Sequence, residues 1–181
     1  MKTYKVMKRA ATTIKADIFD VFDNKNKTNK ILAHQANCFH TMGAGIALEI
    51  KRRYPAAFEA DLLTPVGARK MGTFSYAFID GSRDGDDYRG VANVYSQGKP
   101  GPNPQFSDQR ATSYDAVYDG IDGICNCWAA CSKDDYLQIL VPYGYGCGIA
   151  RGNWDVVSGI LDALSTKYSS EYLQILICKK E

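Results

Sequence analysis

Segments with the apolar pattern of a β-strand alternate along this chain with segments that have the pattern of an amphipathic helix. The segments that we expect to form strands lie at residues 5–17, 30–37, 72–80, 89–96, 136–142 and 172–178. The expected helices lie at residues 46–54, 56–63, 109–131 and 153–168. Strands that alternate with helices favour a sheet layered between helices and joined by right-handed crossovers. We therefore predict an α/β fold of the three-layer α/β/α type, with a central, mostly parallel mixed sheet.

The length of 181 residues suits one domain, which we place at residues 1–181. A Pro/Gly-rich segment, GKPGPNPQ at 98–105, has the composition of an interdomain linker. The chain that follows it is too short for a second complete α/β unit, so we interpret this segment as a surface loop. The charged segment GSRDGDD at 81–87 is typical of a hairpin loop between two strands.

The charge and cysteine content argue against several classes of protein. A net charge of +2, from 22 basic and 20 acidic residues, does not indicate a nucleic-acid binder. Cys125, Cys127 and Cys131 lack the C-x₂-C spacing of structural zinc sites and have no neighbouring His, so we expect no metal and reduced thiols. No apolar run is long enough to span a membrane, and the first residues lack the apolar core of a signal peptide. We expect a cytoplasmic monomer without a cofactor and without a membrane or nucleic-acid partner.

Three of the expected strands run into loops of unusual composition. The strand at 30–37 is followed by CFHTMGAG, the strand at 89–96 by QGKPGPNP, and the strand at 136–142 by YGYGCGIARG. In open α/β sheets, ligands bind just beyond the carboxyl ends of the strands. Convergence of these three loops on one edge therefore predicts a ligand cleft.

Two of the loops are rich in glycine and precede expected helices. Gly43 and Gly45 allow the backbone to approach a ligand closely, and the free N–H groups of the following helix favour an anion. Gly144 to Gly148 precede the helix at 153–168 in the same way. A tight turn with a helix cap explains either loop alone, whereas the pair favours a site for two phosphates, or for a phosphate and a ribose. The sequence GAGIAL lacks the third glycine of the dinucleotide fingerprint, and no Gly-Lys-Ser/Thr of a P-loop follows.

These loops resemble those of a known family. The segments HQANCFHTMGAGIALEIKRRYP and PYGYGCGIARGNW resemble the two ligand loops of macrodomains, the Appr-1″-p processing family. The similarity is to the branch that contains the yeast ADP-ribose 1″-phosphate phosphatase and the terminal ADP-ribose protein glycohydrolase. KADIFD and VANVYSQ resemble further segments of that branch, and the resemblance covers about residues 12–178. It implies a macrodomain fold and a small-molecule partner, an ADP-ribose derivative.

The resemblance also implies which residues bind this ligand. Asp17 would accept a hydrogen bond from the adenine amino group, beside the Ile18 backbone, although an acid that caps a turn after a strand is also consistent with Asp17. Asn37 would bind the distal ribose, and Gly144 to Ile149 would donate N–H groups to the pyrophosphate. The full implied set is Asp17, Ile18, Gln35, Asn37, Met42, Gly43, Ala44, Gly45, Ile46, Gln97, Tyr143, Gly144, Tyr145, Gly146, Cys147, Gly148 and Ile149.

Two departures from the family pattern concern catalysis. The glycohydrolase of this branch uses a Lys and an Asp where this chain has Gln97 and Ala150, and Gln cannot form the covalent adduct that the Lys forms. The candidate catalytic residues are therefore Asn37, His34 and His40, since a His can transfer a proton near pH 7. A buried core histidine is an equally good interpretation of His34, and a solvated loop residue of His40. Backbone amides that grip a phosphate and orient a water are a further route to hydrolysis.

Three functions remain open at this stage. The first is a phosphatase that hydrolyses ADP-ribose 1″-phosphate to ADP-ribose and phosphate. The second is a non-catalytic binder of ADP-ribose, and the third is a hydrolase of ADP-ribosylated or O-acetyl-ADP-ribose substrates. The missing Lys and Asp favour the first over the third, and the sequence does not separate the first from the second.

Overall fold

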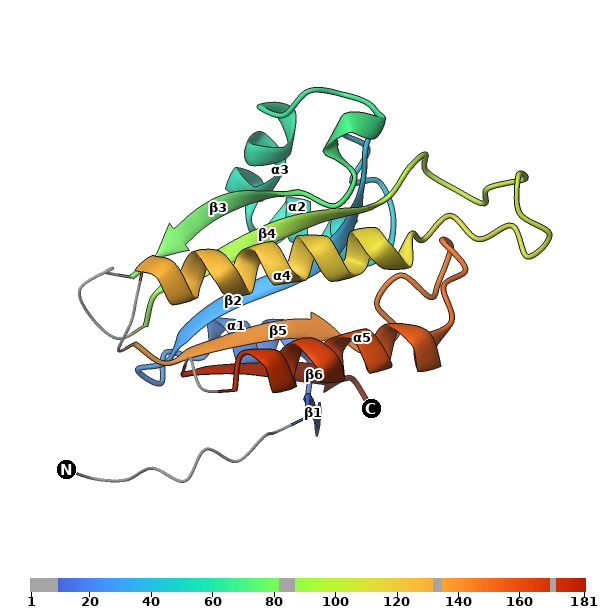
Figure 1. Cartoon of the computed structure of the whole chain (residues 1–181). Helices are drawn as coiled ribbons and strands as arrows, with labels where there is room; N and C mark the ends of the chain where they lie inside the picture. The colour runs from blue at the N-terminus through green and yellow to red at the C-terminus, as the bar shows by residue number, and fades with distance from the viewer. Residues whose placement is uncertain (1–9, 82–86, 132–134, 170–171) are drawn as a thin grey trace.

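A sheet lies between two layers of helices in the computed structural model, which describes residues 10–81, 87–131, 135–169 and 172–181 (Figure 1). The strands are β1 (Thr12–Lys15), β2 (Asn29–Asn37), β3 (Phe74–Asp80), β4 (Arg89–Gln97), β5 (Leu137–Pro142) and β6 (Leu173–Lys179). The helices are α1 (Ile18–Asp23), α2 (Gly45–Arg53), α3 (Pro55–Leu62), the 3₁₀ helix η1 (Ala68–Lys70), α4 (Tyr114–Cys131) and α5 (Trp154–Lys167). The strand order is β1-β6-β5-β2-β4-β3.

The sheet is mixed and mostly parallel, as predicted. Every neighbouring pair of strands is parallel except β3 and β4, which are antiparallel. On one face, α4 and α5 bury residues such as Ile121 and Leu161 against the sheet; on the other, α1, α2 and α3 bury Phe22, Ile50 and Ala57. The two hydrophobic cores confirm the three-layer α/β/α prediction.

The N-terminal part of the chain differs from the prediction of strands over residues 5–17. The strand β1 covers only Thr12–Lys15, and residues 1–9 lie outside the described part of the chain. Asp17 is not in a strand but is the N-cap of α1, where its side chain accepts a hydrogen bond from the Phe19 N–H. The sequence analysis missed α1 because six residues are too few to show a helical period, although a capping Asp before an apolar run is a start signal.

The long helix α4 begins at Tyr114, whereas the apolar spacing predicted a start at residue 109. The residues just before it pair with distant segments: Thr112 forms an isolated bridge with Gln97, and the N–H groups of Ala111 and Thr112 donate to the carbonyl of Ala150. The helix starts only after Ser113, whose carbonyl accepts from Val117 and whose hydroxyl accepts from Ala116. Pairing with the second glycine-rich loop therefore overrides the helical pattern over these residues.

The remaining strands and α-helices follow the prediction within one or two residues, and η1 was not predicted. The antiparallel pairing of β3 with β4 agrees with a hairpin at the charged segment 81–87, of which residues 82–86 lie outside the described part. None of the described helices is long and apolar enough to cross a membrane. All six cysteines are free thiols, and no group of three or more metal-ligating side chains occurs among the described residues.

Candidate functional site

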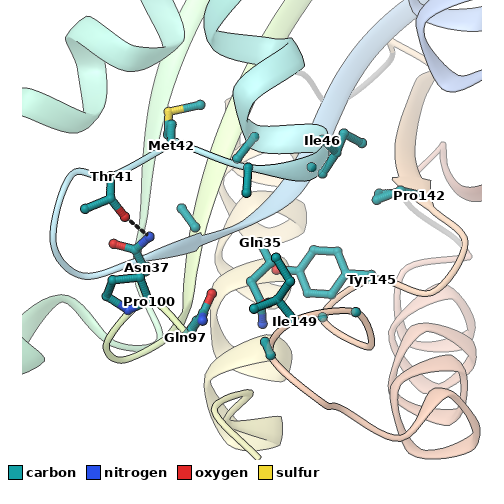
Figure 2. A pocket seen from close by; sticks show the side chains of 18 of the residues that line it. Gln35, Asn37, Thr41, Met42, Ile46, Gln97, Pro100, Pro142, Tyr145 and Ile149 are labelled. Atoms are coloured by element: carbon teal, nitrogen blue, oxygen red, sulfur yellow. Dashed lines mark hydrogen bonds between the residues drawn. The ribbon is translucent and has the colours of Figure 1, made fainter. Parts of the chain in front are cut away.

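A pocket of about 550 Å³ opens where β2, β4 and β5 end. Its lining comes from the three loops that follow these strands, and Figure 2 shows their side chains around the common space. The volume is within the range of small-molecule sites. The position at the carboxyl ends of adjacent parallel strands is the one that the sequence predicted.

The first glycine-rich loop presents unpaired backbone donors to the pocket. Gly45 begins α2 with φ +55°, and Ala44 caps the helix without a side-chain hydrogen bond. Within the described residues, the N–H groups of Gly43 to Ala47 make no hydrogen bond, and all five residues line the pocket. The first N–H groups of a helix have no partner inside the helix, so they are available to an anionic ligand.

The second glycine-rich loop is a series of tight turns. Tyr145 and Cys147 donate their N–H groups to the carbonyls of Pro142 and Gly144, and Gly144 and Gly146 have φ values of +73° and +68°. The N–H groups of Gly148 and Ile149, which line the pocket, have no acceptor among the described residues. Turns of this kind leave adjacent N–H groups facing one side, which is a common way to bind phosphate.

The N-terminus of α5 takes no part in the pocket, contrary to the expectation from the sequence. Asn153 caps α5 with its own side chain, which accepts from the Asp155 N–H. Neither Asn153 nor Trp154 lines the pocket. The second loop therefore contributes its own turn amides and not those of the helix that follows it.

Thr112 fixes the position of the second loop through hydrogen bonds. It was not among the site residues predicted from the sequence. Its Oγ1 donates to the Gly146 carbonyl at 2.6 Å and accepts from Gln35 Nε2 at 3.0 Å. A Cβ added at Gly146 would lie 2.8 Å from Gln35 Nε2 and 3.0 Å from Thr112 Oγ1. The close approach explains a glycine at this position, and it links the ends of β2 and β4 to the second loop.

Polar side chains from the strand ends also line the pocket. Asn37 Nδ2 donates to Thr41 Oγ1 at 2.6 Å, shown dashed in Figure 2, and Asn37 Oδ1 accepts from the Phe39 N–H at 2.9 Å. Gln97 Nε2 donates to the Gly101 carbonyl at 3.4 Å. These side chains shape the loops around the pocket.

Most of the predicted site residues line one pocket. Those that do are Gln35, Asn37, Met42, Gly43, Ala44, Gly45, Ile46, Gln97, Tyr143, Gly144, Tyr145, Gly146, Gly148 and Ile149. Those that do not are Asp17, Ile18, His34, His40 and Cys147. Lining residues outside the predicted set are Ala36, Thr41, Ala47, Asp61, Pro100, Gly101, Pro142 and Ala150.

His34 lies in the core and not in the pocket, which corrects its placement among the catalytic candidates. It is fully buried, and its Nε2 lies 2.7 Å from Asn93 Oδ1. Burial lowers the pKa of His34, so the ring is neutral at physiological pH. A ring enclosed on β2 cannot touch a ligand in the pocket, so the core interpretation holds.

His40 is a residue of the first loop, and its partly buried side chain belongs to a polar cluster. The cluster consists of His40, Asp61, Thr64, Lys70 and Tyr95. Lys70 Nζ lies 3.0 Å from Asp61 Oδ1, and the Tyr95 hydroxyl donates to the same oxygen at 2.8 Å. His40 Nε2 lies 3.3 Å from Thr64 Oγ1 and 3.8 Å from Asp61 Oδ1. Asp61 alone of the cluster lines the pocket, and sequence reasoning missed it because an acid near a helix end carries no distinctive motif.

Asp17 and Ile18 hold the start of α1. Besides the Phe19 N–H, the Asp17 carboxylate contacts Lys180 Nζ at 2.7 Å, and this hydrogen bond lowers the pKa of Asp17. The Ile18 side chain is buried in the core. In this structure Asp17 therefore has the capping contacts that were the alternative interpretation of the sequence.

Tyr145 reaches the pocket with a buried side chain. It is only 2% exposed, and its hydroxyl lies 3.0 Å from Ser96 Oγ. Burial raises the pKa of Tyr145, which keeps the hydroxyl protonated. Cys147 packs against the same core, and its thiol donates to the Tyr145 carbonyl.

Comparison with solved structures identifies the fold. The macrodomain of Mycobacterium tuberculosis DarG is 20% identical, with a TM-score of 0.61 over 93% of this chain and 96% of that one. A macrodomain protein from Streptomyces coelicolor gives the same TM-score at 18% identity, over 93% and 97% of the two chains. Thermosipho africanus DarTG, solved in complex with ADP-ribose, is 15% identical with a TM-score of 0.61, over 97% of this chain and 42% of that one. The chain has the macrodomain fold.

The sequence itself has a closer relative. It is 34% identical over 161 residues to an uncharacterized 17.5 kDa protein from the tk–vs intergenic region of Enterobacteria phage T4. The similarity covers 85% of this chain and 89% of the phage protein. No family model matches the chain. The chain belongs to the family of this phage T4 protein.

Proposed function

We propose that the pocket binds ADP-ribose or a close derivative and that the protein is a phosphatase acting on ADP-ribose 1″-phosphate. The observation that carries the binding proposal is that both loops line one pocket with residues whose backbone N–H groups have no acceptor in the described part of the chain. The Thermosipho protein of the same fold was solved with ADP-ribose, which supports this choice of ligand.

The charges around the pocket favour backbone recognition of the pyrophosphate. Among the described residues that line the pocket, Asp61 is the single charged side chain, and it is an acid. An anionic ligand must therefore obtain its stabilisation from N–H groups and from the N-terminus of α2. Backbone donors of this kind hold phosphates in many nucleotide sites.

The composition of the pocket supports a phosphatase over a glycohydrolase. Gln97 and Ala150 both line the pocket at the positions where the glycohydrolase of the resembled branch has Lys and Asp. With no lysine amine among the described lining residues, the lysine–sugar adduct of that glycohydrolase is not available. Phosphoryl transfer to water needs mainly positioned donors and an oriented water. Membership of the Appr-1″-p processing branch is part of this proposal.

The test is incubation of the full chain with ADP-ribose 1″-phosphate and measurement of released phosphate. The proposal predicts stoichiometric release of phosphate and ADP-ribose. ADP-ribose binding without phosphate release would instead identify the protein as a binding module. Release of acetate from O-acetyl-ADP-ribose, with the phosphate ester untouched, would identify a different hydrolase.

A further inference from the structure

A buried ion pair joins Asp61, which lines the pocket, to Lys70, which does not. Asp61, near the end of α3, is 1% exposed and yet lines the pocket. Its partner Lys70, in η1, is 4% exposed, and the Lys70 ammonium lies 3.9 Å from the centre of the Tyr95 ring. Burying two charges costs several kcal/mol per ion before their attraction is counted, so the pair needs another explanation than stability.

The contacts of Asp61 leave one of its oxygens free. Lys70, Tyr95 and the more distant His40 all approach Oδ1. Within the described residues, no hydrogen bond reaches Oδ2. The one fully enclosed polar side-chain atom that lacks a partner there is Nδ1 of His34, so Oδ2 is not fully enclosed, and Asp61 is the residue of the cluster that lines the pocket. The carboxylate is thus anchored through one oxygen, and the other is the one available to a group in the pocket.

We propose that Asp61 is a catalytic residue of this pocket, which orients the attacking water through Oδ2 and accepts its proton. This inference rests on the proposed phosphatase function. A carboxylate only accepts hydrogen bonds, so it pairs with a water or hydroxyl and not with a phosphate oxygen. A water held between Asp61 and a phosphate on the distal ribose has the arrangement that general-base catalysis requires.

The reaction balances with water as the second substrate. The water oxygen forms a bond to phosphorus while its proton passes to Asp61 Oδ2. The bond between phosphorus and the ribose 1″ oxygen breaks, and that oxygen takes a proton from solvent. ADP-ribose and inorganic phosphate leave, and Asp61 returns its proton to solvent. Lys70 and Tyr95 act as positioning residues that hold the carboxylate through Oδ1.

The experiment compares turnover of ADP-ribose 1″-phosphate with affinity for ADP-ribose in Asp61→Asn. We expect kcat to fall about 10²–10⁴-fold, the usual effect of losing a proton-transferring group. The Kd for ADP-ribose should stay within about threefold, because Asn keeps the size and the hydrogen bond from Tyr95. The matched control is Asp20→Asn, the same change at an exposed acid of α1, which should leave both constants unchanged.

A second variant distinguishes a loss of activity from a loss of folding. Asp61→Asn leaves the Lys70 ammonium buried without its counter-charge, so we pair it with Asp61→Asn/Lys70→Met, in which both charges are absent. Thermal melts identify the variant that is folded, and the loss of kcat should appear in each folded one. Turnover within threefold of the wild type in a folded variant overturns the inference.

The outcomes for the wild type separate this inference from the proposed function. Wild-type protein that binds ADP-ribose but releases no phosphate overturns the role of Asp61 and leaves the binding proposal standing. Wild-type protein that does not bind ADP-ribose overturns both. Phosphate release that is normal in the wild type and lost with Asp61, at unchanged ADP-ribose affinity, supports both.

Discussion

Gly45 combines a constrained backbone with open space beside it. Its φ of +55° favours glycine, and a Cβ at this position would meet no atom within 4 Å. We therefore expect Gly45→Val to fold with a stability loss of about 1–2 kcal/mol from the left-handed conformation. The new side chain would occupy space that the ligand needs, so ADP-ribose affinity should fall at least about tenfold, measured by calorimetry.

The control for Gly45→Val is Gly67→Val. Gly67 also has a positive φ, of +115°, and an open Cβ direction, but it does not line the pocket. Gly67→Val should lower the stability of the protein and leave its affinity for ADP-ribose unchanged. Unchanged ADP-ribose affinity in Gly45→Val would show that the first loop is not part of the binding site.

Asp17 has a capping role that stability measurements can test. Asp17→Asn loses the charge that pairs with Lys180, and its effect on the free energy of unfolding should depend on pH. The folded-state pKa of Asp17 is lowered from 3.8, so its stabilisation is fully present above the unfolded value and disappears as the pH falls below about 4. Urea unfolding should show a constant difference from the wild type between pH 7 and 5, narrowing below pH 4. A difference that grows at acid pH would contradict this account.

Ligand-binding measurements can distinguish two roles of Asp17: the cap of α1, and the adenine contact that the family resemblance implies. If the Asp17 carboxylate accepts a hydrogen bond from the adenine amino group, Asp17→Ala should weaken ADP-ribose binding by roughly 1–3 kcal/mol. The affinity for ribose 5-phosphate should then be unchanged. A loss of cap stability of about 1 kcal/mol with unchanged affinity for both ligands would make Asp17 purely structural.

At the scale of elements, Thr112 couples the segment before α4 to the second loop. Thr112→Val keeps the shape but removes the Oγ1 that contacts Gln35 and the Gly146 carbonyl. Leaving these groups unpaired should cost about 1–3 kcal/mol of stability, and a displaced second loop should weaken ADP-ribose binding about tenfold. Calorimetry at a temperature well below the Tm measures the affinity. Ser158→Ala, at a partly exposed position of α5 that does not line the pocket, is the control and should change neither quantity.

Two helix glycines give opposite predictions for the same change. A Cβ at Gly120 would lie 2.4 Å from Val94 Cγ1, so Gly120→Ala should destabilise by about 1–3 kcal/mol through overpacking of α4 against β4. A Cβ at Gly159 on α5 would meet nothing within 4 Å, so Gly159→Ala should stabilise by up to about 1 kcal/mol. Thermal unfolding of both variants checks the signs. Stabilisation by Gly120→Ala would mean that α4 does not approach the sheet this closely.

The sequence predicted the elements with strong periodicity and the loops that follow the strands. It did not predict α1, because six residues show too little of a helical period, or the late start of α4, because Ala111 and Thr112 pair with a distant loop. Apolar spacing reports which face of a helix is buried and does not report such long-range pairing.

At the site, glycine-rich motifs located both loops, because local sequence determines tight turns and helix starts. The burial of His34 and the clustering of Asp61 with Lys70 and Tyr95 depend on how α3 and η1 pack against β4, which no local motif records.

For the whole molecule, the central claim is that both glycine-rich loops grip one ligand at the carboxyl edge of the sheet. The most direct measurement is isothermal titration of the wild-type chain with ADP-ribose and with AMP in the same buffer. The account predicts that ADP-ribose binds at least about 100-fold more tightly, equivalent to about 2.7 kcal/mol, because only the larger ligand engages both loops. Equal affinity for the two ligands would contradict it.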